Sequence, residues 1–307
     1  TRFWPVSREQ SPKQLQKFVG SGTMIQNTVQ RLFPLVPIEK MYVGTHHQQA
    51  LETLRQLDSL EFSPDHLLAE PCSRNTAAAI GLMARMIADK DANAVMAVFP
   101  ADHVVANSES FIKVLQKAKS LAQKDFLVTL GIPPTRPETG FGYLKQGNEI
   151  NGFQETYHVE QFVEKPDAST AKKYLERGTY FWNCGVFIWK ATTLLEELEK
   201  HAPDIHSQLK TLVGCMQNSK GKLSHLEMNA KGCEIFSSLP SLSIDYAVME
   251  KSSKVVLVPA NIGWSDVGAW NALDDVCEKD TEGNILTGNV LARDCNNSIV
   301  HGQNRLV

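Results

Sequence analysis

The fold is decided by residues 94–132, which read AVMAVFPADHVVANSESFIKVLQKAKSLAQKDFLVTLGI. The apolar runs at 94–99 and 126–132 have the length and composition of buried strands. Between them, apolar residues recur at helical spacing at Phe111, Val114, Leu115, Ala118, Leu121 and Ala122. Ser108 precedes this set and is expected to cap the helix. A strand, a helix and a second strand in this order predict a parallel sheet flanked by helices.

The same alternation precedes this stretch. Apolar runs at 41–44 and 66–69 predict two further strands. Apolar residues at helical spacing over 25–33 and 80–87 predict two further helices, the second of them capped by Asn75. The expected class is therefore α/β, with a Rossmann-like mixed, mainly parallel sheet flanked by helices. Ligands of such sheets bind beyond the carboxyl ends of the strands, so functional side chains should follow the apolar runs directly.

The pattern changes after residue 135. Segments 135–147 and 157–166 are extended and carry polar residues, which favours an antiparallel pair. Helices are expected again near 168–177 and 191–200. From about residue 280, short β segments are broken by Gly and Asn. We therefore expect a main domain over residues 1–279 and an incomplete C-terminal β-helix-like module over residues 280–307.

Composition excludes several classes of function. A net charge of −3 offers no basic face for nucleic acid. No apolar run approaches the roughly 18 to 20 residues that a membrane-spanning helix needs. The six cysteines form no C-x-x-C pair and match no zinc spacing, which in a chain of 307 residues is typical of reduced thiols. We expect a cytoplasmic protein that binds neither nucleic acid nor membranes.

The first 14 residues, TRFWPVSREQSPKQ, form a stiff cationic loop. Arg2 and Lys13 supply positive charge, and Pro5 and Pro12 restrict the backbone. A guanidinium can bind phosphate through two N–H groups and an ammonium acts as a point charge, so the loop suits a phosphate chain. A solvated surface loop explains the same residues.

Two distant aspartates lie in turn-like contexts. Asp102 follows a predicted strand in FPADH (99–103), and Asp266 lies among glycines in NIGWSDVGAW (261–270). Mg²⁺ prefers one or two carboxylates together with phosphate oxygens and water. Both aspartates could serve one cation if the fold brings them together, with His103 orienting the first of them. Two ordinary turn residues are the alternative.

A strand-to-helix turn in EPCSRNTAAAI (70–80) carries Glu70, Arg74, Asn75 and Thr76. A carboxylate there can accept from the N1–H and exocyclic amine of guanine, and an amide can serve its O6 or N7. The free N–H groups of the helix start add to such a site. Simple N-capping by Asn75, with Glu70 on the surface, explains the residues as well.

Three later segments place polar side chains beside glycines. They are ETGFGYLKQG (138–147) with Gly142, FVEKPD (162–167) with Glu164 and Lys165, and WNCG (182–185) with Asn183. A carboxylate, an ammonium and an amide form a natural set for sugar hydroxyls and a sugar phosphate. Each segment alone also fits a hairpin or a rim ion pair worth under about 1 kcal/mol.

Taken in order, these motifs resemble the bacterial mannose-1-phosphate guanylyltransferases, or GDP-mannose pyrophosphorylases, of the sugar nucleotidyltransferase family. The opening of that family, roughly GGxGTRLWPLSRxxxPKQ, survives here as TRFWPVSREQSPKQ. The likeness covers about residues 1–300 and continues through EPCSRNTAAAI, FPADH, PTRPETGFGY, FVEKPD, WNCGVF, SIDYAVMEK and GWSDVGAW. The resemblance implies that a strand and a glycine-rich loop precede Thr1. Ser73, Ala78 and Cys184 depart from the usual Gly, Pro and Ser, and the first two put the nucleotide preference in doubt.

The resemblance implies Mg²⁺-assisted transfer of GMP from GTP to mannose 1-phosphate, with GDP-mannose and pyrophosphate as products. It assigns nucleotide binding to Thr1, Arg2, Lys13, Glu70, Arg74, Asn75, Thr76, Pro100 and Asp102. It assigns sugar binding to Gly142, Tyr143, Glu164, Lys165, Asn183, Gly185, Asp245 and Tyr246. It assigns the metal to Asp102 and Asp266, and catalysis to these two with Arg2, Lys13 and Lys165. Another sugar 1-phosphate or nucleotide, and a catalytically silent GDP-mannose sensor, stay open as alternatives, and a homodimer is among the expected assemblies.

Overall fold

The computed structural model describes residues 3–220 and 223–302. The chain clusters into two compact units. The smaller unit comprises residues 1–31, 101–106 and 263–307, and the larger comprises residues 32–100 and 107–262. The expected division into residues 1–279 and 280–307 stays a prediction.

The larger unit is built on a six-stranded mixed sheet. Its strands, in spatial order, are β3 (Val95–Val98), β8 (Tyr180–Lys190), β5 (Leu127–Ile132), β11 (Val255–Pro259), β7 (Tyr157–Val163) and β6 (Gly142–Glu149). Strands β5 and β11 run parallel, whereas the other pairs of this sheet are antiparallel. Strand β8 also pairs with β6, so β8, β5, β11, β7 and β6 form a closed circuit. All six residues of β5 are buried, as its apolar sequence predicts.

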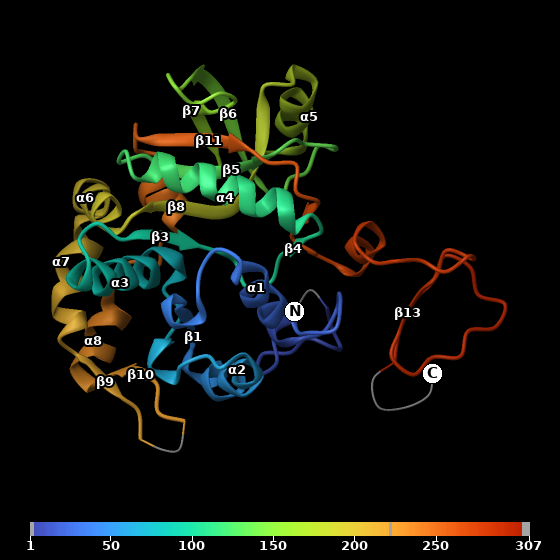
Figure 1. Cartoon of the computed structure of the whole chain (residues 1–307), viewed down its shortest axis with the longest axis horizontal. Coiled ribbons are helices and arrows are strands. Elements are labelled where there is room, and N and C mark those ends of the chain that lie inside the picture. Colours follow the sequence, from blue (N-terminus) through green and yellow to red (C-terminus); the bar gives the residue numbers. More distant parts are fainter. Residues whose placement is uncertain (1–2, 221–222, 303–307) are drawn as a thin grey trace. The chain divides into compact units, whose positions relative to one another are not determined.

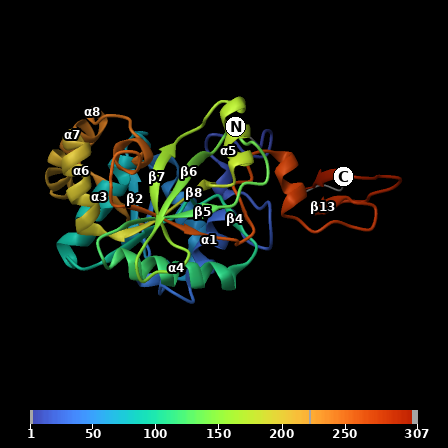
Figure 2. The same ribbon diagram turned by 90° about the horizontal axis from the view of Figure 1, so that it is seen from above.

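A second sheet and a set of helices complete the larger unit. The sheet has the order β1 (Val43–His46), β2 (Leu67–Glu70), β10 (Leu226–Met228) and β9 (Met216–Asn218). The helices are α2 (Ala50–Leu57), α3 (Asn75–Lys90), α4 (Ser108–Ala122), α5 (Ala168–Arg177), α6 (Ala191–His201), α7 (Pro203–Val213) and α8 (Ala230–Ser238). Helix α4 packs along β5 and β8 (Figure 1), whereas α3, α6, α7 and α8 gather at one end of the unit (Figure 2). Their apolar faces enclose a core that includes Trp189, Leu82 and Phe236.

These elements confirm the expected mixed α/β class. The predicted strands match β1, β2, β3 and β5 to within about two residues, which is the usual uncertainty of element ends. Segments 142–149 and 157–163 form the expected antiparallel pair. The expectation of a mainly parallel sheet is wrong for the six-stranded sheet, where only β5 and β11 pair in parallel. The long strand β8 runs antiparallel to both β3 and β5, so it separates the strands that the alternation predicted to be neighbours.

Both predicted helix caps are wrong by one residue. Helix α4 is capped by Asn107, whose Oδ1 accepts from the N–H of Ser110, while Ser108 is already helical. Asn75 begins α3 with a left-handed φ of 59°, and its side chain accepts from the adjacent N–H of Thr76. The preceding Arg74 caps the helix without a side-chain hydrogen bond.

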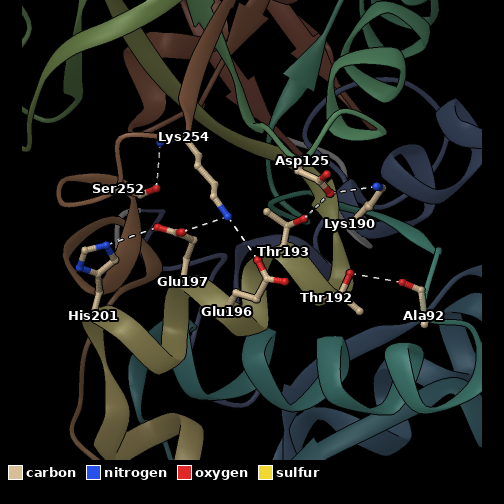
Figure 3. A network of polar contacts seen from close by, with 10 residues as sticks. All are labelled: Ala92, Asp125, Lys190, Thr192, Thr193, Glu196, Glu197, His201, Ser252 and Lys254. Carbon is tan, nitrogen blue, oxygen red and sulfur yellow. Dashed lines mark hydrogen bonds and ion pairs between the residues drawn. The ribbon is translucent and has the colours of Figure 1, made fainter.

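Helix α6 is fastened to its neighbours by a polar network (Figure 3). Lys254, before β11, lies 3.3 Å from carboxylate oxygens of both Glu196 and Glu197, and His201 Nε2 lies 3.3 Å from Glu197. Burial alone would raise the pKa of Glu197, but hydrogen bonds from Ser252 and Lys254 outweigh it and hold that pKa below its usual value. The network therefore stabilises the charged form of a buried carboxylate.

The smaller unit has its own core. Phe3, Phe18 and Trp270 pack at its centre, with the rings of Phe3 and Phe18 4.3 Å apart. Two short strand pairs belong to it, β4 (Val104–Val105) with antiparallel β12 (Trp264–Ser265), and β13 (Ile285–Thr287) with parallel β14 (Ile299–His301). Helix α1 (Met24–Leu32) follows the opening loop. In the part of the chain that the structure describes, no helix is both long enough and apolar enough to cross a bilayer.

Candidate active site

The smaller unit brings three of the predicted motifs together at Lys13. Its Nζ donates to Asp102 Oδ2 at 3.1 Å and also to the backbone oxygen of Asp266. The Lys13 side chain is only 12% exposed, whereas that of Asp102 is 37% exposed. The opening loop, FPADH and GWSDVG therefore converge on one ammonium group. Thr1 and Arg2, which were assigned to the nucleotide and to catalysis, lie outside the described residues.

A short strand pair explains this convergence. In the antiparallel pairing of β4 with β12, Val104 lies opposite Ser265. Extending the register by one residue sets Asp266 opposite His103, the immediate neighbour of Asp102. A pair of two-residue strands carries too little hydrophobic pattern to be seen in a sequence.

His103 contacts both motifs through its ring. The indole N–H of Trp264 donates to His103 Nδ1 at 3.1 Å, so the neutral ring carries its proton on Nε2. That nitrogen lies 3.8 Å from Asp102 Oδ1. This distance is too long for a hydrogen bond, so the orienting role of His103 toward Asp102 stays a prediction.

The oxygen donors at this place fit a hard divalent cation. Carboxylate oxygen is the ligand that such ions prefer, and a positive charge already lies between Asp102 and the backbone of Asp266. Within residues 3–220 and 223–302, no group of three or more His, Cys, Asp and Glu side chains has metal-site geometry. A cation held here would therefore need further oxygens from phosphate or water.

In the larger unit, the predicted sugar-binding residues cluster around Asn183. Its Nδ2 donates to Asp245 Oδ1 at 3.0 Å, and the register of β8 with β6 sets it opposite Gly142. A Cβ added at Gly142 would lie 2.5 Å from Glu164 Oε2, so glycine is what allows that carboxylate to lie against the strand. Glu164 Oε1 lies 3.1 Å from Lys165 Nζ. Segments far apart in the sequence thus place an amide, two carboxylates and an ammonium together.

Neighbouring carboxylates in this cluster help to raise the pKa values of Asp245 and Glu250. Burial first, and then the nearby Glu164, raise the pKa of Asp245 to about 6, against the lowering effect of a hydrogen bond from Asn183. Burial, with Glu164 and Asp245 nearby, also raises the pKa of Glu250. A ligand that donates hydroxyl hydrogens would relieve this crowding of acceptors, and the exposed Lys165 suits a phosphate.

The remaining residues assigned to the sugar, Tyr143, Gly185 and Tyr246, differ from one another in burial and backbone conformation. The side chain of Tyr143 is completely buried and its hydroxyl donates to the backbone oxygen of Glu138 at 2.9 Å, so its ring belongs to the core. Gly185 adopts a φ of 71°, and a Cβ there would lie 3.4 Å from Pro100. Tyr246 is 44% exposed.

The predicted base-binding loop is anchored by its own side chains. Arg74 Nη2 donates to the backbone oxygen of Ser237, and Thr76 Oγ1 accepts from the N–H of Ile244 at 2.9 Å. Glu70 ends β2, and burial raises the pKa of its carboxyl to about 7. The structure thus gives Arg74 and Thr76 a structural contact that the sequence did not indicate, and their contacts to a base stay predictions.

Left-handed backbone at non-glycine residues recurs in these motifs. Asn75, Lys165 and Val267 have φ of 59°, 49° and 44°. This conformation costs roughly 1 to 2 kcal/mol for an L-residue, and for a β-branched residue such as Val267 it is an outlier. Val267 directly follows Asp266, and Lys165 directly follows Glu164. Strain of this kind can mark functional sites, but Glu61, Asp125, Glu155, Asp294 and Asn297 share the conformation outside these motifs, so it does not by itself assign a role to either turn.

The sequence did not point to one residue of the cluster around Asn183. Thr129 Oγ1 lies 3.0 Å from Asn183 Oδ1 in the interior of the unit. Its signal was a single hydroxyl in the otherwise apolar strand LVTLGI.

Comparison with known proteins gives consistent matches. Residues 1–283 match the family model described as nucleotidyl transferase. The alginate biosynthesis protein AlgA of Pseudomonas syringae pv. tomato is 38% identical over 308 aligned residues, which cover 100% of this chain and 62% of the relative. A mannose-1-phosphate guanylyltransferase of Salmonella montevideo is 38% identical over 311 residues, which cover 100% of this chain and 64% of the relative. The chain thus spans less than two thirds of the length of these relatives.

A solved structure is also similar. A protein of Thermus thermophilus, described as a mannose-1-phosphate geranyltransferase, matches with a TM-score of 0.83 and 34% sequence identity. The match covers 100% of this chain and 85% of that one. This likeness agrees with the α/β class that the sheets and helices establish.

Proposed function

The chain belongs to the nucleotidyl transferase family, and from that premise we propose that it transfers GMP from GTP to mannose 1-phosphate. The products are GDP-mannose and pyrophosphate. The observation that carries the proposal is the meeting of Lys13 with the carboxylate of Asp102 and the backbone of Asp266, three motifs far apart in the sequence. The guanylyltransferase relative supports the choice of substrates.

The reaction needs positioning more than acid–base chemistry. A phosphate oxygen of mannose 1-phosphate forms a bond to the α-phosphorus of GTP, and the bond from that phosphorus to the pyrophosphate oxygen breaks. Because the nucleophile is already an anion, no general base has to remove a proton. The obstacle is the approach of two anions, so neutralisation of charge dominates the barrier.

Nucleotidyl transferases generally use divalent metal ions. Here we assign Mg²⁺ to Asp102 and Asp266, where it supplies positive charge to phosphate oxygens when bound. Lys13, with Arg2, neutralises the phosphates of GTP and favours the departure of pyrophosphate. Lys165 holds the phosphate of the sugar substrate.

Specificity is assigned to the larger unit. The Glu164 carboxylate, the Asn183 amide and the backbone at Gly142 bind hydroxyls of mannose, with Asp245 beside them. The ionised carboxylate of Glu70 accepts from the N1–H and amino group of guanine, a pair of donors that adenine does not offer in that arrangement. Arg74 and Thr76 keep the loop in place through Ser237 and Ile244.

The test measures pyrophosphate release by the intact protein with Mg²⁺ and mannose 1-phosphate, using each of the common nucleoside triphosphates in turn. We expect release with GTP and much less with ATP, UTP or CTP. Release that favours another triphosphate, or that does not depend on mannose 1-phosphate, would contradict the choice of substrates. Binding of GDP-mannose without any turnover would instead identify a sensor.

A further inference from the structure

Thr129 carries the one polar side chain of strand β5, whose other residues are apolar. Every residue of β5 is buried, and Thr129 is 0% exposed. A buried hydroxyl costs free energy unless it is hydrogen-bonded. Two acceptors are in reach, Asn183 Oδ1 at 3.0 Å and the backbone oxygen of Val186 at 3.4 Å. A hydroxyl has one hydrogen, and the shorter contact is the better bond.

An irregularity in β8 brings Asn183 to this hydroxyl. Thr129 pairs with Phe187 and Gly131 pairs with Asn183, so β5 advances by two residues where β8 advances by four. The two extra residues form a bulge, in which Gly185 adopts a φ of 71°. The backbone N–H of Gly185 then donates to Asn183 Oδ1 at 3.2 Å.

These contacts fix which way the Asn183 amide faces. A backbone N–H can only donate, so the atom that Gly185 approaches must be the amide oxygen. The amide nitrogen then faces Asp245 Oδ1 at 3.0 Å, as a carboxylate requires. Turning the amide would set its NH₂ against the N–H of Gly185 and its oxygen against a carboxylate. An amide has two N–H bonds, and beyond the one that Asp245 accepts, the second can serve a ligand.

We propose that Thr129 is a positioning residue, whose hydroxyl holds the Asn183 amide so that a sugar hydroxyl meets an N–H beside the carboxylates of Asp245 and Glu164. The inference rests on the proposed function, since it takes a sugar 1-phosphate as the ligand of this cluster. Thr129 itself is completely buried and touches no ligand. Its contribution is to discriminate between sugars that differ in the direction of a hydroxyl, because a fixed donor rewards one direction only.

The test compares Thr129→Val, which keeps the branched shape and removes the hydroxyl, with Thr129→Ser, which keeps the hydroxyl. In the Val variant of the intact protein, we expect KM for mannose 1-phosphate and Kd for GDP-mannose to rise about 10-fold, with KM for GTP within about 2-fold of wild type. The preference in kcat/KM for mannose 1-phosphate over its epimer glucose 1-phosphate should fall by a similar factor. The Ser variant should retain the wild-type values.

Two results would overturn the role of Thr129. One is an active wild type whose sugar preference and KM for mannose 1-phosphate survive Thr129→Val. The other is an equal loss with both sugars and both substrates, accompanied by a lower Tm, which would mark a structural role only. If the Val variant does not fold, Thr129→Ala removes the same hydroxyl and the same split is expected. A wild type that releases no pyrophosphate with any sugar 1-phosphate would refute the proposed function itself, and the inference with it.

Discussion

Replacing Lys13 by Met should abolish most turnover and leave the fold intact. Lys13 Nζ lies 3.1 Å from Asp102 Oδ2, a distance at which unit charges attract by about 5 kcal/mol at an effective dielectric of about 20. Desolvation and side-chain entropy offset most of this in the folded protein. Because the Asp102 side chain is 37% exposed, solvent screening leaves about 1 kcal/mol or less for stability.

The effect on catalysis should be larger. A preorganised charge that meets charge in the transition state is worth about 3 kcal/mol, or roughly 100-fold in rate. The assay is pyrophosphate release at saturating GTP and mannose 1-phosphate, with Tm measured on the same samples. Lys172→Met, an exposed lysine of α5, is the matched control and should behave like wild type. Turnover of the Lys13 variant within about 3-fold of wild type, at an unchanged Tm, would refute the assignment of Lys13 to the phosphates.

Three further predictions concern the larger unit. Because the pKa of Glu70 is raised to about 7, its carboxylate forms as the pH rises through that value, so KM for GTP should fall between about pH 6 and pH 8. In the Glu70→Gln variant, KM for GTP should change with pH only through the titration of GTP itself. An identical pH profile of KM in both proteins would contradict the role of Glu70. Gly142→Ala would push a Cβ to 2.5 Å from Glu164 Oε2, so KM for mannose 1-phosphate should rise about 10-fold while KM for GTP stays unchanged. Equal changes in the two KM values would argue against a sugar site here. Glu197→Gln should lower the free energy of unfolding by roughly 2 kcal/mol near pH 7, because it leaves Lys254 without its buried partner. Since the pKa of Glu197 is lowered in the folded state, this stabilisation is present above the ordinary glutamate pKa near 4.5 and is lost as the pH falls below that value. Urea unfolding that gives the same difference in unfolding free energy between wild type and variant at about pH 7 and about pH 3 would contradict this account.

Much of the larger unit could be predicted because burial leaves a periodic trace in sequence. Apolar spacing alone predicts strand β5 and helix α4, and the structure buries all of β5 and the apolar face of α4. The course of β8 could not be predicted in the same way. Its pairing with β3, β5 and β6 is long-range, and the sequence of β8 does not indicate whether these strands run parallel or antiparallel to it.

Some residues of the candidate site could likewise be predicted from the sequence, and others could not. Lys13, Asp102 and Asp266 were named because charged groups stood in stiff or glycine-framed turns, and the structure brings them together. The ring of Tyr143 fills the core, which its glycine-rich segment does not reveal, and its assignment to the sugar stays a prediction. Thr129 was missed because the β-branched threonine is as common in strands as valine, so its presence in a strand does not indicate a function. Its partner lies in another strand, so only the fold reveals it.

The anchoring of the loop at Arg74 and Thr76 limits how this protein can be redesigned. The same few residues that fasten this loop, Ser237 and Ile244, lie on the segment that leads into Asp245. A library that varies the positions proposed to bind the base would therefore disturb the neighbouring carboxylate as well. Improvements found separately at the proposed base site and the proposed sugar site should combine poorly. Variants with an altered preference for the nucleotide and variants with an altered preference for the sugar phosphate would have to be selected together in one round, with the 74–76 loop and the 237–245 segment both varied.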